Sequence, residues 1–302
     1  MKMQRRDFIK RSMVGVGGLM LGAGIRADET AKPAGIDPYA RVELGTTKVK
    51  MSRLCMGTGV HGGNRESNLT RMGKEKCEAL LHNAYERGVR TFDLADLYGT
   101  HPYLIPALQG IPRDRIQIIS KIWFRQGGIP DTDRPDADVV IQRFLKEIKT
   151  DYLDLVLLHC VESPKWPEEL RKQMEIMAKL KQKGVIRAHG VSCHSLAALQ
   201  AAVTEPWVDS VHARINPYGT KMDGPAEKVA PVLKDLCKAG KGVVGMKLIG
   251  EGAFSKDEEK KNASINFVLG LGCVHILNVG FESVEQIDDF ANRVKKANPT
   301  PA

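Results

Sequence analysis

The chain has 302 residues, of which 42% are hydrophobic and 27% charged, and its formal net charge is +9. This composition excludes a disordered or fibrous chain, and six cysteines are too few for a disulfide scaffold. The length suits two small domains or one (β/α)8 barrel of roughly 250 residues. The cysteines form no Cys-x-x-Cys pair and the histidines lack zinc-type spacing, so we expect no metal.

The positive charge is concentrated in the first 27 residues. They hold six Lys or Arg and one acidic residue, whereas the rest of the chain holds 39 Lys or Arg against 35 Asp or Glu. The remaining excess of four, with both signs interspersed, is typical of a soluble surface. No basic stripe with interleaved aromatic residues occurs, so we do not expect nucleic acid as a partner.

The N-terminus has the order of a signal peptide. A charged start with Arg5 and Arg6 precedes an apolar, glycine-rich run over residues 13–25 and then Ala27. The run is shorter than the roughly 20 residues of a membrane span. A basic tail or an amphipathic anchor is the alternative. The paired arginines before Phe8, Ile9 and Lys10 resemble a twin-arginine export signal.

That resemblance implies a protein that folds in the cytosol, passes through the twin-arginine export machinery and works in the periplasm or otherwise outside the cytosol. We expect residues 1–27 to be the signal, with a cut after Ala27, and residues 28–39 to be a linker. Once cut, the protein would keep no membrane span; an uncut form would stay anchored in the membrane.

Residues 40–298 alternate short apolar runs with amphipathic helical stretches, and no linker interrupts them. Predicted strands are Arg53–Thr58, Val89–Leu94, Ile116–Ile122, Leu153–His159, Ile186–Ser192, Val208–Ile215, Gly242–Leu248 and Cys273–Gly280. Strands that alternate with helices form parallel sheets. Eight such units predict an α/β fold, a closed (β/α)8 TIM barrel in one domain over 40–298. Residues 41–50 read as a β-hairpin at the barrel bottom.

A doubly wound nucleotide-binding fold is the structural competitor. Residues 57–62 match the Gly-x-Gly-x-x-Gly pattern after a predicted strand. No helix opens at Gly62, however, and the nearest acidic residue at a strand end, Asp93, lies more than 30 residues further on, against about 20 in that motif. The glycines are more consistent with a flexible first loop at a barrel mouth.

Four polar residues stand at or just after predicted strand ends, where barrel enzymes place their chemistry: Asp93, Tyr98, Lys121 and His159. Each alone fits an ordinary role, such as a helix cap or a core histidine; together they can move a proton. We expect the Lys121 ammonium to lower the pKa of Tyr98. Asp93 would hold Lys121, Tyr98 would be the general acid, and His159 would bind a carbonyl oxygen. A bound hydride carrier would have to supply electrons.

The segments Phe92-Asp93-Leu94-Ala95-Asp96-Leu97-Tyr98-Gly99, Ser120-Lys121, Asp154–His159 and Gly190-Val191-Ser192 make the chain resemble an aldo-keto reductase over residues 40–298. The family's Asp, Tyr, Lys and His tetrad falls on the four residues named above. The resemblance implies reduction of aldehydes and ketones with a nicotinamide cofactor, usually NADPH, bound without a Rossmann fold.

The resemblance also implies a set of cofactor-binding residues. They are Thr58, Ser192, Cys193, His212, Lys247, Leu248, Gly280 and Glu282. Two depart from the family pattern. Cys193 replaces an Asn and has no amide, and His212 replaces a Gln; it can bond the cofactor carboxamide or be an ordinary strand residue. Lys247 lines the cofactor channel or is a solvated strand end.

Relatives often place Arg or Lys where Glu282 follows Gly280 and Phe281. A carboxylate repels the 2′-phosphate of NADPH and accepts hydrogen bonds from ribose hydroxyls. The cofactor is therefore NAD or NADP, with a preference for NAD unless Glu282 points to solvent.

The segments 160–166 and 249–255 are short and suggest an open, polar mouth suited to a sugar or polyol. The leading hypothesis is an exported oxidoreductase that transfers hydride between the nicotinamide and a small polar aldehyde, ketone or sugar. The alternatives are a sugar epimerase or lyase with a bound nicotinamide and no net redox change, and a non-catalytic binding barrel.

Overall fold

The computed structural model describes residues 35–301, which form one compact unit. Its barrel strands are β3 (Leu54–Gly57), β4 (Thr91–Asp93), β5 (Gln117–Ile122), β6 (Leu155–Val161), β7 (His189–Cys193), β8 (Ser210–Arg214), β9 (Gly242–Met246) and β10 (Ile276–Gly280). They close in the order β10-β3-β4-β5-β6-β7-β8-β9, every neighbouring pair parallel. The predicted (β/α)8 barrel is confirmed.

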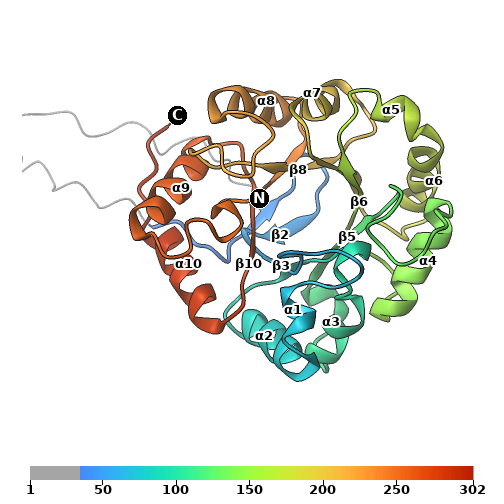
Figure 1. The fold of residues 1–302 in the computed structure, drawn as a ribbon, viewed down its shortest axis with the longest axis horizontal. Helices are drawn as coiled ribbons and strands as arrows, with labels where there is room; N and C mark the ends of the chain where they lie inside the picture. Colours follow the sequence, from blue (N-terminus) through green and yellow to red (C-terminus); the bar gives the residue numbers. More distant parts are fainter. Residues whose placement is uncertain (1–34, 302) are drawn as a thin grey trace, which may run out of the picture. The chain divides into compact units, whose positions relative to one another are not determined.

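Helices surround the barrel (Figure 1). They are α1 (Asn68–Arg71), α2 (Lys74–Glu86), α3 (His101–Ala107), α4 (Ala137–Ile148), α5 (Trp166–Glu169), α6 (Arg171–Gln182), α7 (Leu196–Thr204), α8 (Ala226–Lys238), α9 (Glu258–Gly270) and α10 (Val284–Lys296), with 3₁₀ turns η1 (Asp96–Tyr98), η2 (Arg113–Arg115) and η3 (Gly250–Gly252). In α4 the apolar residues Val140, Phe144 and Ile148 are all buried, as their spacing requires. The helices thus bury one apolar face against the outside of the sheet.

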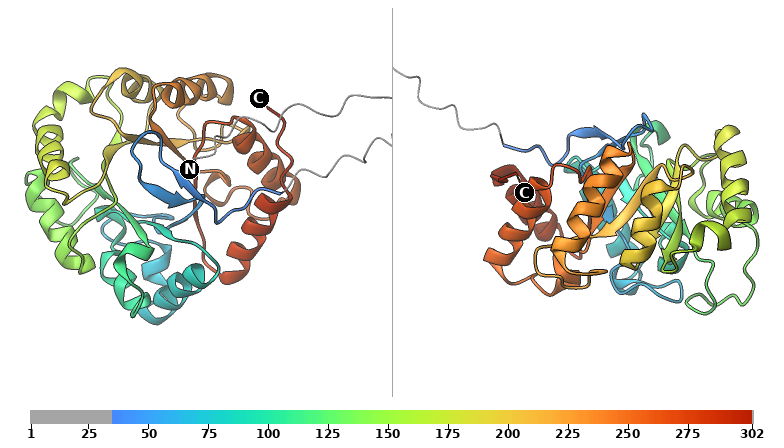
Figure 2. Two further views of the ribbon diagram at one scale, coloured as in Figure 1. Left: turned by 180° about the vertical axis from the view of Figure 1, so that it is seen from behind. Right: turned by 90° about the horizontal axis from the view of Figure 1, so that it is seen from above.

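The hairpin closes the end of the barrel opposite the strands' carboxyl ends (Figure 2, left). Its strands β1 (Arg41–Glu43) and β2 (Lys50–Ser52) pair antiparallel. Leu44 and Met51 are fully buried and belong to the same apolar cluster as the inward-facing residues Ile119 and Leu155. A Cβ on Gly242 would lie 2.4 Å from Leu44, so the hairpin fits against the barrel only because β9 begins with glycine.

The loop after β3 does not open a nucleotide-binding helix, since α1 begins only at Asn68 behind its N-cap Ser67. Its glycines make room for an aromatic ring instead. A Cβ on Gly59 would lie 2.2 Å from the ring of Tyr98, and one on Gly62 would lie 2.6 Å from it. The loop therefore packs over Tyr98, the predicted general acid.

Within residues 35–301, no helix has the length and apolar character that crossing a membrane requires. The predicted signal, residues 1–27, lies outside the described residues, as do residues 28–34 of the predicted linker.

Candidate active site

The four predicted catalytic residues meet at the mouth of the barrel. Asp93 ends β4, Tyr98 ends the short turn η1, and Lys121 and His159 lie near the ends of β5 and β6. The Tyr98 hydroxyl lies 3.5 Å from Nζ of Lys121 and 3.3 Å from Nε2 of His159. Parallel strands bring residues from distant parts of the chain to one edge, which accounts for this convergence.

Lys121 and Asp93 form an ion pair that is almost completely buried, with Nζ 2.6 and 2.7 Å from the two carboxylate oxygens. Nζ also donates to the Leu94 carbonyl at 3.0 Å. Burial by itself would raise the pKa of Asp93, but the Lys121 charge and the neighbouring His212 ring outweigh it and hold that pKa below its usual range. Asp93 is therefore a carboxylate that fixes the ammonium in place.

The structure corrects the expected pKa of Tyr98. Burial and the negative charge of Asp93 raise that pKa well above its usual value of 10, whereas the sequence argument had Lys121 lowering it. The main reason is burial, which disfavours the charged phenolate; in addition, Asp93 lies nearer to the ammonium than the phenol does and offsets its charge. Tyr98 thus stays protonated at neutral pH, which is the form that a general acid needs.

His159 is a neutral imidazole in this setting. Burial, followed by the charge of Lys121, lowers its pKa well below 6.5. Its Nδ1 is buried without a partner, and Trp123 stands edge-on with ring centroids 5.6 Å apart. A neutral imidazole carries one N–H, so His159 can donate to a carbonyl oxygen without adding a charge.

A cleft of about 740 Å³ opens beside the tetrad. The loop after β3, the segment 246–252 and the start of α10 line it, and Asp93 and Tyr98 reach into it. Four predicted cofactor residues line it as well: Lys247, Leu248, Gly280 and Glu282. Volume and position suit an elongated ligand with one end at Tyr98.

Ser192 and His212 have polar atoms with no partner in the protein. Both residues are buried, and Oγ of Ser192 and both ring nitrogens of His212 make no hydrogen bond. His212 Nε2 lies 3.5 Å from Oδ1 of Asp93. Orphaned buried groups cost roughly 1–3 kcal/mol each, and a carboxamide, which both donates and accepts, would satisfy them. The residues present therefore fit the nicotinamide end of a dinucleotide.

Four predicted cofactor residues do not line the cleft: Ser192 and His212, which are buried, and Thr58 and Cys193. The Thr58 hydroxyl is buried, donates to the Asp93 carbonyl at 2.8 Å and lies 2.8 Å from the Thr100 hydroxyl. Cys193 belongs to the outer core between sheet and helices, where burial raises the pKa of its thiol. Because successive strand residues face opposite sides, an inward Ser192 sends Cys193 outward.

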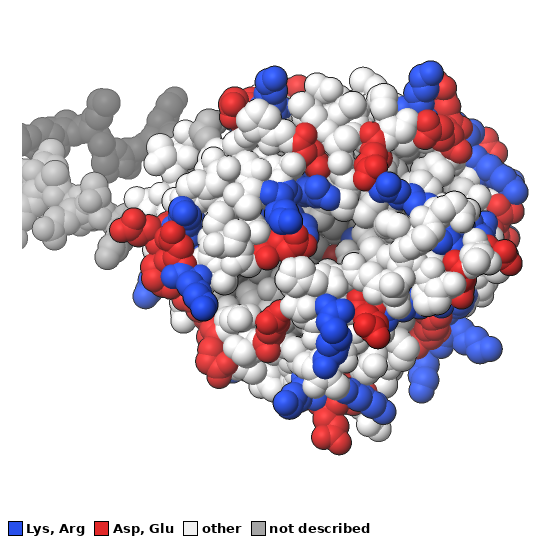
Figure 3. All heavy atoms as spheres, in the orientation of Figure 1, with Lys and Arg blue, Asp and Glu red and all other residues white. Residues whose placement is uncertain are grey.

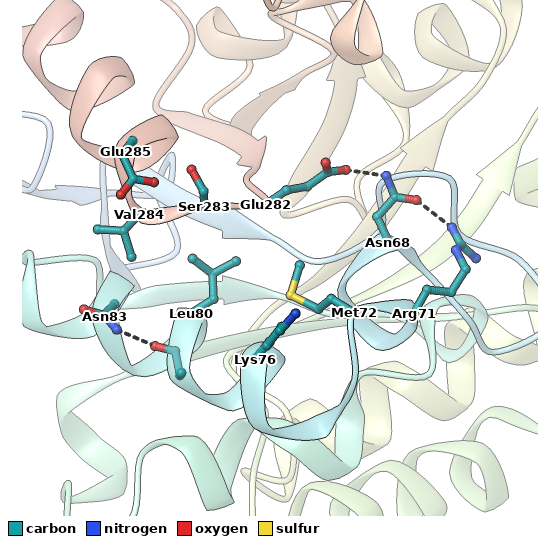
Figure 4. A pocket seen from close by; sticks show the side chains of 11 residues that line it. Asn68, Arg71, Met72, Lys76, Leu80, Asn83, Glu282, Ser283, Val284 and Glu285 are labelled. Atoms are coloured by element: carbon teal, nitrogen blue, oxygen red, sulfur yellow. Dashed lines mark hydrogen bonds between the residues drawn. The ribbon is translucent and has the colours of Figure 1, made fainter.

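Glu282 sits where the cleft continues into a groove between α2 and α10 (Figure 4). Its carboxylate accepts from the Asn68 amide, and Asn68 in turn accepts from Arg71 at 2.6 Å. Two further acids, Glu285 and Asp289, line the same stretch of the cleft. The basic residues Arg71, Lys76 and Lys261 line the cleft and groove as well, so both signs of charge occur there.

Sequence reasoning missed a residue of the site. The Asn278 amide, inside the otherwise apolar strand β10, donates to Oδ2 of Asp93 at 2.6 Å. A lone polar residue in a buried strand was the available signal.

It also missed polar groups at the rim of the mouth. Arg214 contacts His194 and lies 3.2 Å from the Asp223 carboxylate. Across this face acidic and basic side chains alternate (Figure 3).

Comparison with known proteins agrees with this geometry. The model of the aldo/keto reductase family matches residues 53–297. An aldo-keto reductase AFTS1 of Alternaria alternata is 24% identical over 75% of this chain and 69% of its own length. An NADH-specific methylglyoxal reductase of Escherichia coli is 24% identical, the match spanning half of this chain and 51% of the relative.

Solved structures share the fold. The aldo-keto reductase AKR11C1 of Bacillus halodurans, in its holo form, superposes with a TM-score of 0.66 at 19% identity, covering 86% of this chain and 91% of its own. An aldo-keto reductase of Klebsiella pneumoniae in complex with NADPH gives 0.62 at 16% identity, covering 85% and 90%. With the family model spanning most of the barrel around the tetrad, the chain belongs to the aldo/keto reductase family of oxidoreductases.

Proposed function

We propose that this protein reduces a small polar aldehyde, ketone or sugar, with Tyr98 as the proton donor. The observation that carries the proposal is the position of the Tyr98 hydroxyl, 3.5 Å from Lys121 and 3.3 Å from His159. A carbonyl oxygen bonded to both Tyr98 and His159 would sit where the charge of reduction develops. When bound, a nicotinamide dinucleotide would supply the hydride.

The protein's own groups each have a defined task in this scheme. His159, neutral, orients the carbonyl oxygen and donates a hydrogen bond to it. Tyr98 gives its proton to that oxygen as the alcohol forms. Lys121, held by Asp93, then faces a phenolate instead of a phenol, and the attraction between ammonium and phenolate lowers the free energy of the transition state.

We further propose that the dinucleotide is NAD(H). Glu282 supports this, because its carboxylate faces the groove with Glu285 nearby, and carboxylates repel a 2′-phosphate but accept from ribose hydroxyls. The relative from Escherichia coli is named NADH-specific. Direct titration of the protein with NADH and NADPH tests this: NADPH binding more than about tenfold tighter (about 1.4 kcal/mol) would overturn it.

The substrate class is inferred from the mouth of the barrel and from relatives. Arg125 pairs with Glu162 and Arg214 with Asp223 around it, so a hydroxylated or otherwise polar carbonyl compound would find partners there. Several relatives, including DkgB of Salmonella typhimurium, which matches over 52% of its length, are named methylglyoxal reductases. Methylglyoxal and small aldoses are therefore the first substrates to assay.

We also propose that the protein works outside the cytosol, in the periplasm, after export through the twin-arginine machinery. The support is the sequence of residues 1–27, with Arg5 and Arg6 before an apolar run. Fractionation of cells that express the full chain, compared with an Arg5→Lys/Arg6→Lys variant, tests it: the variant should remain in the cytosol.

The deciding experiment follows oxidation of reduced nicotinamide by absorbance with each candidate carbonyl, alongside native mass spectrometry of the purified protein. Stoichiometric oxidation with the wild type and loss of turnover in Tyr98→Phe, with dinucleotide binding retained, would support the proposal. Conversion of a sugar without net oxidation would indicate an epimerase or lyase. A folded protein that binds neither dinucleotide would indicate a non-catalytic barrel and overturn it.

A further inference from the structure

The Asp93 carboxylate accepts a hydrogen bond from a second residue besides Lys121. Its Oδ2 receives Lys121 at 2.7 Å and the Asn278 amide at 2.6 Å, and the amide comes from β10, two strands away around the barrel. Asn278 is nine-tenths buried and lines the cleft beside Tyr98. An amide that donates to a buried carboxylate makes a charge-assisted hydrogen bond, which is stronger than a neutral one.

A glycine on the intervening strand makes this contact possible. In the sheet, β3 lies between β10 and β4, and Gly57 is paired with Asp93 on one side and with Gly280 on the other. A Cβ at Gly57 would lie 2.7 Å from Oδ1 of Asn278. Asn278 therefore reaches Asp93 over the gap that Gly57 leaves.

We propose that Asn278 is a positioning residue of the tetrad, which fixes the Asp93 carboxylate from β10 through the gap at Gly57 so that Lys121 keeps its place beside Tyr98. The inference rests on the proposed reductase function for its kinetic consequences, but the contact itself does not. Asn278 acts through Asp93: its amide is bonded there.

The kinetic test uses the full-length protein and the isosteric change Asn278→Leu. Losing a hydrogen bond to a charged group should lower kcat roughly tenfold, while KM and the dissociation constant of NADH stay within about twofold, because substrate and dinucleotide keep their own contacts. Gly57→Ala should reproduce the fall in kcat, since its Cβ displaces the amide. Gly224→Ala, just before α8, whose Cβ would meet only Leu196 and Val229 at 3.6 and 3.8 Å, is the matched control and should behave as wild type.

A second test needs no turnover. In Asn278→Asp, two carboxyl groups would share the site, so one should hold its proton to a pH well above the ordinary aspartate range. Carbon NMR of labelled aspartate side chains should show this titration, and it should vanish in Asp93→Asn/Asn278→Asp. Kinetically, Asn278→Asp should lose activity as pH rises through that titration.

The outcomes separate the two claims. If Asn278→Asp titrates like an ordinary aspartate, or Asn278→Leu keeps the wild-type kcat, the positioning role is wrong whatever the enzyme does. If wild type turns over no carbonyl compound but the shared titration is found, the contact stands and the proposed reductase function fails.

Discussion

The Ser120 hydroxyl lies 2.8 Å from Nε2 of His101, on the outer face of the strand whose inner face carries Lys121. The other ring nitrogen of His101 lies 2.7 Å from the Glu147 carboxylate. Both Ser120 and His101 are buried, so the arrangement has the layout of a hydrolytic triad without access to a substrate. These contacts hold the outer face of β5, the strand that carries Lys121.

The same hydrogen-bond network extends to η1, the 3₁₀ turn that carries Tyr98. Arg143 donates to Glu147 at 2.8 Å and to the buried Asp96 at 2.7 Å, and Asp96 begins the 3₁₀ turn that ends at Tyr98. Arg65 holds Asp96 from the opposite side at 3.0 Å. The backs of the two elements that carry Tyr98 and Lys121 are thus joined through one network.

Removing the charge of Glu147 should make stability less sensitive to acid. Burial would raise the pKa of Glu147, but hydrogen bonds from His101 and Arg143 outweigh it and lower that pKa to about 2. A depressed carboxyl pKa stabilises the fold above the unfolded value near 4.5 and loses this effect as pH falls towards about 2. Glu147→Gln should cost about 1–2 kcal/mol at neutral pH. Urea unfolding of both proteins from about pH 7 down to pH 3 should show the gap closing; a constant gap would contradict the prediction.

The contribution of Asp223 to stability should depend on pH with the opposite sign to that of Glu147. Its burial raises its pKa to about 6 although the charge of Arg214 opposes this. The fold therefore favours the protonated form, so ionised Asp223 destabilises the protein above about pH 6, and the penalty fades as pH falls towards the unfolded value of 3.8. Asp223→Asn should be more stable by about 1–2 kcal/mol at about pH 8, and less so at about pH 5. Thermal unfolding at the two pH values measures this, and a larger gain at the lower pH would refute it.

Carbonyl reduction should have a broad pH plateau. The pKa of Tyr98 is raised by burial and that of His159 is lowered by burial, so neither changes protonation between about pH 7 and 9. We expect kcat to vary less than about threefold over that range. An inflection near the ordinary histidine value that disappears in His159→Gln would show that His159 titrates in the working enzyme.

The charge of Glu282 should determine dinucleotide choice. Glu282→Lys would remove a carboxylate beside Asn68 and bring an ammonium to the edge of the cleft. NADPH should then bind roughly tenfold tighter than it binds wild type, with NADH changed less, because only NADPH carries the extra phosphate. Fluorescence titration at low and high salt gives both constants. An equal effect on the two dinucleotides would show that Glu282 does not face the 2′ position.

The barrel could be predicted because each of its strands is a short apolar run between amphipathic helices. Most predicted strands are longer than the observed ones, as for Val89–Leu94 against the observed Thr91–Asp93, since hydrophobicity continues past the ladder hydrogen bonds; β6 and β7, however, extend beyond their predicted ends at His159 and Ser192. The tetrad followed from residue types at strand ends. Asn278 stands out as a lone polar residue in a buried strand, but its bond to Asp93 and the network behind Ser120 could not be predicted, because they depend on contacts between strands or helices that no local pattern encodes.

Two predictions failed for different reasons, one local and one not. The alternation that turns Ser192 inward also turns Cys193 away from the cleft, and this was readable from the sequence. The direction of the Tyr98 pKa was not, because it depends on how completely Asp93 compensates Lys121 and on burial.

The β1–β2 hairpin at the bottom of the barrel constrains the order in which the chain can fold. Thr46 bonds to the Gly240 carbonyl through both its amide and its hydroxyl, at 2.9 and 3.1 Å, across 194 residues of sequence. The hairpin leaves the ribosome first, but its native contacts cannot form until β9, the seventh barrel strand, has been synthesised. Closing so long a loop is entropically costly, so sealing the bottom should be among the last events of folding, and the hairpin's apolar side chains stay available to a chaperone until then.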